Sequence, residues 1–178
     1  MSDDLIEIVL DGPPRGKGRP KFRTLHPKKG LASTIPGQKP RTITYTDAET
    51  RAYELKIAWQ AKAVMRGRPP LDGPVHLTVI GYLPIPAYLS KADKIAAEKG
   101  DIVPIGKIDI DNIAKSAMDG INGIVFHDDN QVVLASICKF YSAKPRLRIS
   151  VGRYIARGMG DDVAVSGAGT EEIQGDTG

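Results

Sequence analysis

Apolar residues recur along the chain in the pattern of a small sheet covered by helices. Four segments, at residues 5–10, 75–83, 131–140 and 147–154, are apolar or alternate between apolar and polar positions. Such alternation is typical of half-buried strands, because successive side chains of a strand point to opposite faces. The last two segments flank an Ala-Lys-Pro turn at 143–145, so we expect them to pair as a hairpin.

A long helix is predicted at residues 48–66, between the first two strands. The stretch from Thr46 to Glu49 reads as a capping box, in which the Thr46 hydroxyl accepts from the Glu49 amide. Gly67 and the two prolines that follow end the helix. Residues at helical spacing form the expected core face, which is Ala48, Ala52, Leu55, Trp59 and Ala63.

A second main helix is predicted at residues 112–122. Asp111 is its expected N-cap and Gly123 its expected stop. Its expected buried stripe is Ile113, Ala117 and Ile121. A short polar helix at 91–99, capped by Ser90, is read as a surface excursion before it.

This order of elements predicts one α+β domain. We expect a small mixed sheet of about four strands with two main helices, in the order β-α-β-α-β-β. The domain is expected to cover residues 1–157. Residues 158–178 are rich in glycine and acids without periodicity, and we expect them to form a disordered tail.

Charge is segregated along the chain. The net charge is +4, but residues 1–157 hold 25 basic against 16 acidic residues, a net +9. A domain this basic favours a polyanionic partner, most often nucleic acid, although a merely soluble basic surface is the alternative. With no long apolar run and an acidic start, we expect no membrane span or signal peptide, and hence a cytoplasmic protein.

Five basic residues crowd the stretch 15–23. Its glycines and proline exclude a stable helix or a central strand. We therefore expect an exposed loop, continued by a long polar loop at 26–42, whose bases contact phosphates. The expected DNA-binding residues here are Arg15, Lys17, Arg19, Lys21 and Arg23. A solvated loop without a partner is the alternative.

Two polar clusters flank the second main helix. The first holds Asp109, Asp111 and Lys115, and the second holds His127, Asp128 and Asp129. Acids set among isoleucines need a counter-charge, a metal ion or hydrogen-bond donors. Because the helix between the clusters is short, we expect three of these acids to converge.

Converging carboxylates suit Mg²⁺ or Mn²⁺, which prefer hard oxygen ligands, and His127 is then expected to be a bystander. Lys115 would stabilise negative charge on a phosphate. Asn112 either caps the helix or hydrogen-bonds a phosphate. The alternative is structural, with the acids acting as helix caps and turn formers. An EF-hand is excluded because Ile113 and Ala114 occupy ligand and glycine positions.

These motifs resemble the RusA family of Holliday-junction resolvases of bacteria and their phages. The resemblance rests on Asp109-Ile110-Asp111-Asn112-Ile113-Ala114-Lys115, on Asp119-Gly120-Ile121 and on Asp128-Asp129-Asn130-Gln131-Val132. Pro13-Pro14 and the Gly-Lys-Gly-Arg-Pro-Lys-Phe loop are similar too. The similarity covers residues 5–155.

The resemblance implies a homodimeric, Mg²⁺-dependent endonuclease that cuts four-way DNA junctions by paired nicks. It places the essential metal-binding acids at Asp109, Asp111 and Asp129, the essential lysine at Lys115 and a supporting acid at Asp128. Mn²⁺ is expected to substitute for Mg²⁺. Two functions remain as alternatives, which are a non-catalytic nucleic-acid-binding module and a less selective phage nuclease.

Overall fold

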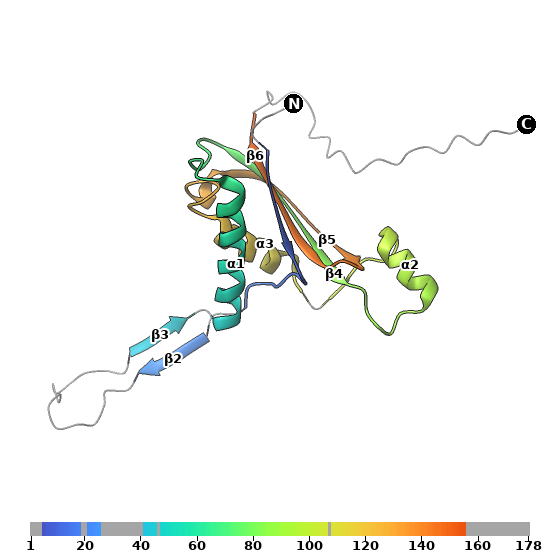
Figure 1. The fold of residues 1–178 in the computed structure, drawn as a ribbon. Helices are drawn as coiled ribbons and strands as arrows, with labels where there is room; N and C mark the ends of the chain where they lie inside the picture. The colour runs from blue at the N-terminus through green and yellow to red at the C-terminus, as the bar shows by residue number, and fades with distance from the viewer. Residues whose placement is uncertain (1–4, 19–20, 26–40, 46, 107, 156–178) are drawn as a thin grey trace, which may run out of the picture.

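The computed structural model describes residues 5–18, 21–25, 41–45, 47–106 and 108–155. The expected tail at 158–178, the loop at 26–40, Arg19 and Thr46 lie outside the described residues. A four-stranded sheet carries α1 (Ala48–Met65) and α3 (Ile110–Ile121) on one face, and α2 (Lys91–Lys99) lies at its end (Figure 1). This is the predicted α+β class, with a third, shorter helix.

The sheet is mixed and has the strand order β1-β6-β4-β5. Its strands are β1 (Ile6–Asp11), β4 (Val75–Pro84), β5 (Val132–Ser142) and β6 (Arg146–Arg153). Strand β4 pairs parallel with β5 and antiparallel with β6, and β1 pairs antiparallel with β6. Two parallel neighbours need a crossover connection, and the segment carrying α2 and α3 supplies it between β4 and β5.

The expected hairpin of the last two strands is wrong. Strands β5 and β6 both pair with β4, which lies between them. Along β4, buried residues alternate with half-buried ones up to Leu83, so one face of the strand lies in the core and the other is partly exposed. The turn at 143–145 therefore passes over the end of one strand instead of joining neighbours.

The basic segment also differs from the expected loop. Residues 21–25 form β2 (Lys21–Leu25) and pair antiparallel with β3 (Arg41–Tyr45), in a ribbon apart from the main sheet (Figure 1). A two-stranded ribbon leaves most of its side chains in solvent. Its sequence therefore lacks the alternation of apolar and polar residues by which a strand of a buried sheet is predicted. The proline and glycines precede the ribbon and do not interrupt it.

The core face of α1 is rotated from the predicted one. The buried residues are Thr50, Tyr53, Ile57, Ala61 and Met65. Trp59 and Leu55, both expected in the core, are 73% and 53% exposed. Two stripes of α1 have helical spacing, and the contact with α3 selects the stripe that contains Ile57. The helix begins at Asp47, whose carboxylate accepts from the Glu49 amide, so the cap lies one residue later than predicted.

Helix α3 packs closely against α1. A Cβ atom placed on Gly120 would lie 2.6 Å from the Ile57 Cβ, which leaves no room for a larger residue. The predicted stripe of Ile113, Ala117 and Ile121 is confirmed as fully buried. Gly123 has φ +70° just beyond the helix and ends it as predicted. Ser90 caps α2 and Gly100 ends it, also as predicted.

Gly120→Ala should lower the free energy of unfolding by about 1–3 kcal/mol, because the added methyl group overpacks the α1–α3 contact. At an exposed helix position, Gly→Ala instead raises the free energy of unfolding by ~0.5–1 kcal/mol, so the sign of the change reports on the packing. Urea unfolding followed by circular dichroism measures the change, with Gln60→Ala on the exposed face of α1 as the control. Unchanged or increased stability of Gly120→Ala would contradict the close packing.

Candidate nuclease site

The first acid cluster lies at the exposed start of α3. Asp109 is the N-cap residue, one turn before Ile113, and its side chain makes no capping hydrogen bond. Asp111, expected as the cap, lies instead in the first turn of the helix. Its carboxylate is 2.9 Å from the Lys115 ammonium, one turn further along the same face. The hydrogen bond from Lys115 holds the pKa of Asp111 below its usual value.

Two backbone contacts fix the chain on either side of this cluster. The Lys139 ammonium donates to the Ile108 carbonyl over 2.9 Å, from the second half of β5. The Lys17 amide donates to the Asn112 carbonyl over 2.9 Å. Gly16 lies so close that a Cβ atom there would be 2.9 Å from the Asn112 Cβ. The two acids thus stand on a backbone held from both sides.

The basic stretch meets α1 and α3 through its first residues. Arg15 forms an exposed ion pair with Glu49 over 2.9 Å. Lys17 is less available than expected, because it forms an ion pair with Asp119 and lies 4.0 Å from Glu54. The hydrogen bond with Asp119 raises the pKa of Lys17, and burial raises the pKa of Glu54. Lys17 therefore ties the loop to both helices.

The remaining expected DNA contacts stay predictions. Lys21 and Arg23 lie on β2, where their side chains lie outside the described residues. Asn112 is half-buried, and its amide lies 3.4 Å from an Asp109 carboxylate oxygen, beyond good hydrogen-bond distance. The amide is therefore available to another partner at the start of α3.

The second acid cluster follows α3 and forms a tight turn at η1 (Asp129–Gln131). Asp128 caps this turn by accepting from the Asn130 amide, and Gln131 completes a capping box. The Gln131 side chain also donates to the carbonyls of Leu71 and Gly73, at 2.9 and 2.7 Å. Asp128 thus has a structural part, whereas Asp129 is exposed.

The His127 ring lies 3.0 Å from an Asp72 carboxylate oxygen on the neighbouring loop. This pairing gives His127 a partner away from the acids of the first cluster. Its expected part as a bystander stays a prediction.

The hydrogen bonds of Gln131 and Lys139 were not predicted. The sequence signal for Lys139 is a single cation at the end of an uncharged strand segment, Val132–Cys138.

The two acid clusters do not converge within one chain, contrary to expectation. Asp109 precedes α3 and Asp129 follows it, and a helix of 12 residues is about 18 Å long. Across the described ranges, no three Asp, Glu, His or Cys side chains gather as a metal site. Strand β5 begins shortly after Asp129 and pairs there with the start of β4. Lys139, which binds the Ile108 carbonyl, lies further along β5 and pairs with Gly81 in the second half of β4.

The first cluster alone has the donors that a magnesium ion uses. Mg²⁺ is commonly held by one or two carboxylates, with water and substrate phosphates completing its octahedron. Asp109 and Asp111 provide two exposed carboxylates at a helix N-terminus, where free amide groups also favour phosphate. The residues present therefore fit a site that is completed by a phosphate or by a further acid.

Lys17→Met should lower the free energy of unfolding at pH 7 by on the order of 1 kcal/mol, since solvent screens a pair about a third exposed. Without the ammonium, the pKa of Glu54, which burial already raises, loses the lowering effect of Lys17 and rises further above its unfolded value. That penalty is present above the folded pKa of Glu54 and disappears as pH falls below the unfolded one. The deficit should therefore shrink towards pH 4.

Urea unfolding at pH 7 and pH 4 measures this change, with Lys56→Met on an exposed position of α1 as the control. In the wild type the raised pKa of Lys17 has the complementary effect. Its contribution is complete below the unfolded pKa of about 10.4 and is lost as pH rises through the folded value. A deficit that grows towards pH 4 would overturn this assignment.

The chain is similar to known proteins over most of its length. Residues 11–152 match the family described as endodeoxyribonuclease RusA. The uncharacterized protein YqaN of Bacillus subtilis (strain 168) is 30% identical over 150 residues, covering 83% of this chain and 96% of the relative. Within the described residues, no helix is long and apolar enough to cross a membrane. The family match spans both acid clusters and the basic loop, so this chain belongs to the RusA endodeoxyribonuclease family.

Proposed function

We propose that this protein is a Mg²⁺-dependent endonuclease that resolves four-way DNA junctions by paired nicks, in recombination, repair or phage DNA processing in the cytoplasm. One observation supports it beyond family membership. Asp109 is an N-cap residue whose exposed carboxylate makes no capping hydrogen bond and has only a long contact, 3.4 Å, with the Asn112 amide. The structural alternative applies well to Asp128, which does cap its turn, and poorly to Asp109.

Different residues at the first acid cluster would bind the metal ion, stabilise the transition state and contact the DNA. Asp109 and Asp111 would hold Mg²⁺, with Mn²⁺ as a substitute. The bound ion activates water and offsets negative charge at phosphorus. Lys115 would exchange Asp111 for a phosphate oxygen and stabilise the charge that develops in the transition state. Asn112 and Arg15, with Lys21 and Arg23 on the ribbon, would contact the backbone phosphates of the DNA.

Paired nicks at one junction require two equal sites, which a two-fold dimer supplies. Strand β5 is the surface that favours dimerisation. It is an edge strand of 11 residues whose first seven carry no charge, and Val133 and Leu134 are 55% and 44% exposed. Edge strands usually carry charges, prolines or bulges that prevent pairing. The opposite edge, β1, has six residues and carries Glu7 and Asp11.

Antiparallel pairing of two β5 edges would also complete the metal site. Such pairing lays the start of one β5 beside the end of the other. Asp129 lies three residues before the start of β5, and Lys139, which holds Ile108, lies in the second half of the strand. Asp129 of the partner subunit would therefore come beside Asp109 and Asp111. We infer a site shared between two chains, which accounts for acids that do not converge within one.

Asp111→Asn should abolish cleavage of a synthetic four-way junction in Mg²⁺ while junction binding is kept or tightened, because a negative charge near the phosphates is removed. Asp128→Asn is the matched control and should keep cleavage, since Asn also caps helices well. Denaturing gels measure the nicks, and fluorescence anisotropy measures binding. Normal cleavage by Asp111→Asn would remove the proposed site.

The same gels separate the alternatives. A non-catalytic module predicts binding that EDTA does not change and no product with Mg²⁺ or Mn²⁺. A general nuclease of phage DNA processing predicts comparable cutting of a linear duplex of the same sequence. Cutting confined to the junction and abolished by EDTA supports the resolvase.

A heterodimer of Asp111→Asn and Asp129→Asn chains should recover nicking that neither homodimer shows. In a shared site, one of the two sites then combines native Asp109 and Asp111 with native Asp129 of the other chain. Two affinity tags allow the heterodimer to be purified from co-expressed chains. If each site lies within one chain, both sites of the heterodimer carry a lesion and no product forms.

The interface has its own control in the same assay. Leu134→Lys in both chains places a charge on the β5 edge and should give monomers by light scattering, with no recovered nicking. Val9→Lys places the same charge on β1, at the other edge, and should leave the dimer intact. A Leu134→Lys protein that stays dimeric would contradict pairing through β5.

A further inference from the structure

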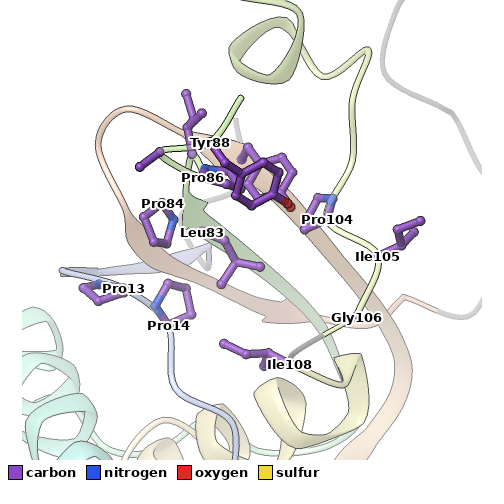
Figure 2. A pocket seen from close by; sticks show the side chains of 13 residues that line it. Pro13, Pro14, Leu83, Pro84, Pro86, Tyr88, Pro104, Ile105, Gly106 and Ile108 are labelled. Atoms are coloured by element: carbon purple, nitrogen blue, oxygen red, sulfur yellow. The ribbon is translucent and has the colours of Figure 1, made fainter. Parts of the chain in front are cut away.

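An apolar cavity of about 500 Å³ opens beside the first acid cluster. It lies between the Pro13-Pro14 segment, the end of β4 with the residues that follow it, and the segment that leads into α3 (Figure 2). Its volume falls within the ~300–1,000 Å³ of ordinary ligand sites. Its walls include Pro13, Pro14, Leu83, Pro86, Tyr88 and Ile108.

Among the residues that the structure describes, no charged side chain lines this cavity. The lining consists of proline, leucine, isoleucine, alanine, glycine and tyrosine residues, with the hydroxyl groups of Tyr88 and Tyr141 as its polar side-chain atoms. Tyr88 is 85% exposed, at the mouth of the cavity (Figure 2). Flat proline and tyrosine rings suit a flat, uncharged aromatic group, and an exposed apolar site of this size marks a binding surface.

The cavity shares a wall with the proposed metal site. Ile108 lines it and is followed directly by Asp109. Two described cations lie near it. Lys139 donates to the Ile108 carbonyl, and Arg15 follows Pro14 and lines the neighbouring hollow with it. A DNA strand that crosses the acids at Asp109 would therefore pass an apolar hollow with the Lys139 and Arg15 cations near it.

We propose that this cavity receives one unstacked nucleobase of the DNA strand that is cut, next to the phosphate that a metal ion at Asp109 and Asp111 would hold. The inference rests on the proposed function and extends it to a base-binding site. Nucleobases taken out of a helix are bound by stacking on aromatic and apolar side chains, at a cost of a few kcal/mol for unstacking. Bases that are not held in a regular paired stack cost least to extrude, and we expect bases next to a branch point to be of this kind. The cavity would thus favour junctions over linear duplex.

Junctions that carry 2-aminopurine at successive positions near the branch point test this inference. The wild-type protein is bound to each junction in EDTA, which prevents cleavage, and binding is followed by anisotropy of a separate dye. We expect a several-fold rise in 2-aminopurine fluorescence at one position per strand, because the base leaves its stacked neighbours for walls made mainly of aliphatic groups.

Ala87→Phe fills the cavity from an exposed wall position and should remove that rise. Ala92→Phe makes the same change on exposed α2, outside the cavity, and should keep it. Both variants should bind the junction, because the phosphate contacts remain. A rise that persists in Ala87→Phe would mean that the base unstacks elsewhere and would overturn the cavity assignment.

The outcomes separate this inference from the proposed function. Bound junctions whose fluorescence changes at no position remove the base site and leave the nuclease proposal standing. A junction that does not bind removes both. If Ala87→Phe changes the oligomeric state measured by light scattering, the cavity belongs to a contact between protein chains, and the base-binding assignment is overturned.

Discussion

The burial of one face of α3 is the constraint on which the site depends. This helix lies against α1 and the sheet, with Gly120 on Ile57 and Ile113 on Gly81. Because its inner face is fixed, its first turn presents Asp109 and Asp111 to solvent in one orientation. The same burial sends the chain away from these acids for the whole length of the helix. Packing thus both builds the first acid cluster and separates it from the second.

Elements with one strong local signal could be predicted from the sequence. Helix α2 has a serine cap and a glycine stop, and both lie where they were expected. The buried stripe of α3 and the strand β4 follow from periodicity alone. The pair of Asp111 and Lys115 follows from helical spacing, because residues four apart share a face. At the site, the arrangement within the first acid cluster could therefore be predicted from the sequence.

The remaining features depend on contacts between distant segments. Helix α1 has two apolar stripes, and only its contact with α3 decides that Trp59 faces solvent. The place of β4 between β5 and β6 is a choice among strand pairings that local patterns do not encode. The part of Lys17 is similar, because its partners Asp119 and Glu54 lie far away in the chain. Its charge suggested a contact with DNA, but in the structure its ammonium pairs with acids of α1 and α3.

The pairing of β1 with β6 has a consequence for how the protein is made. These are the first and last strands of the described chain, and Ile6 lies opposite Val151. During synthesis, β1 emerges early and has no partner until residue 153 has left the ribosome. The sheet closes only then, and its sequence-distant pairings are expected to make folding slow. The orientation of the acids at the start of α3, which depends on packing against this sheet, is therefore set only after the last strand of the described chain has been made.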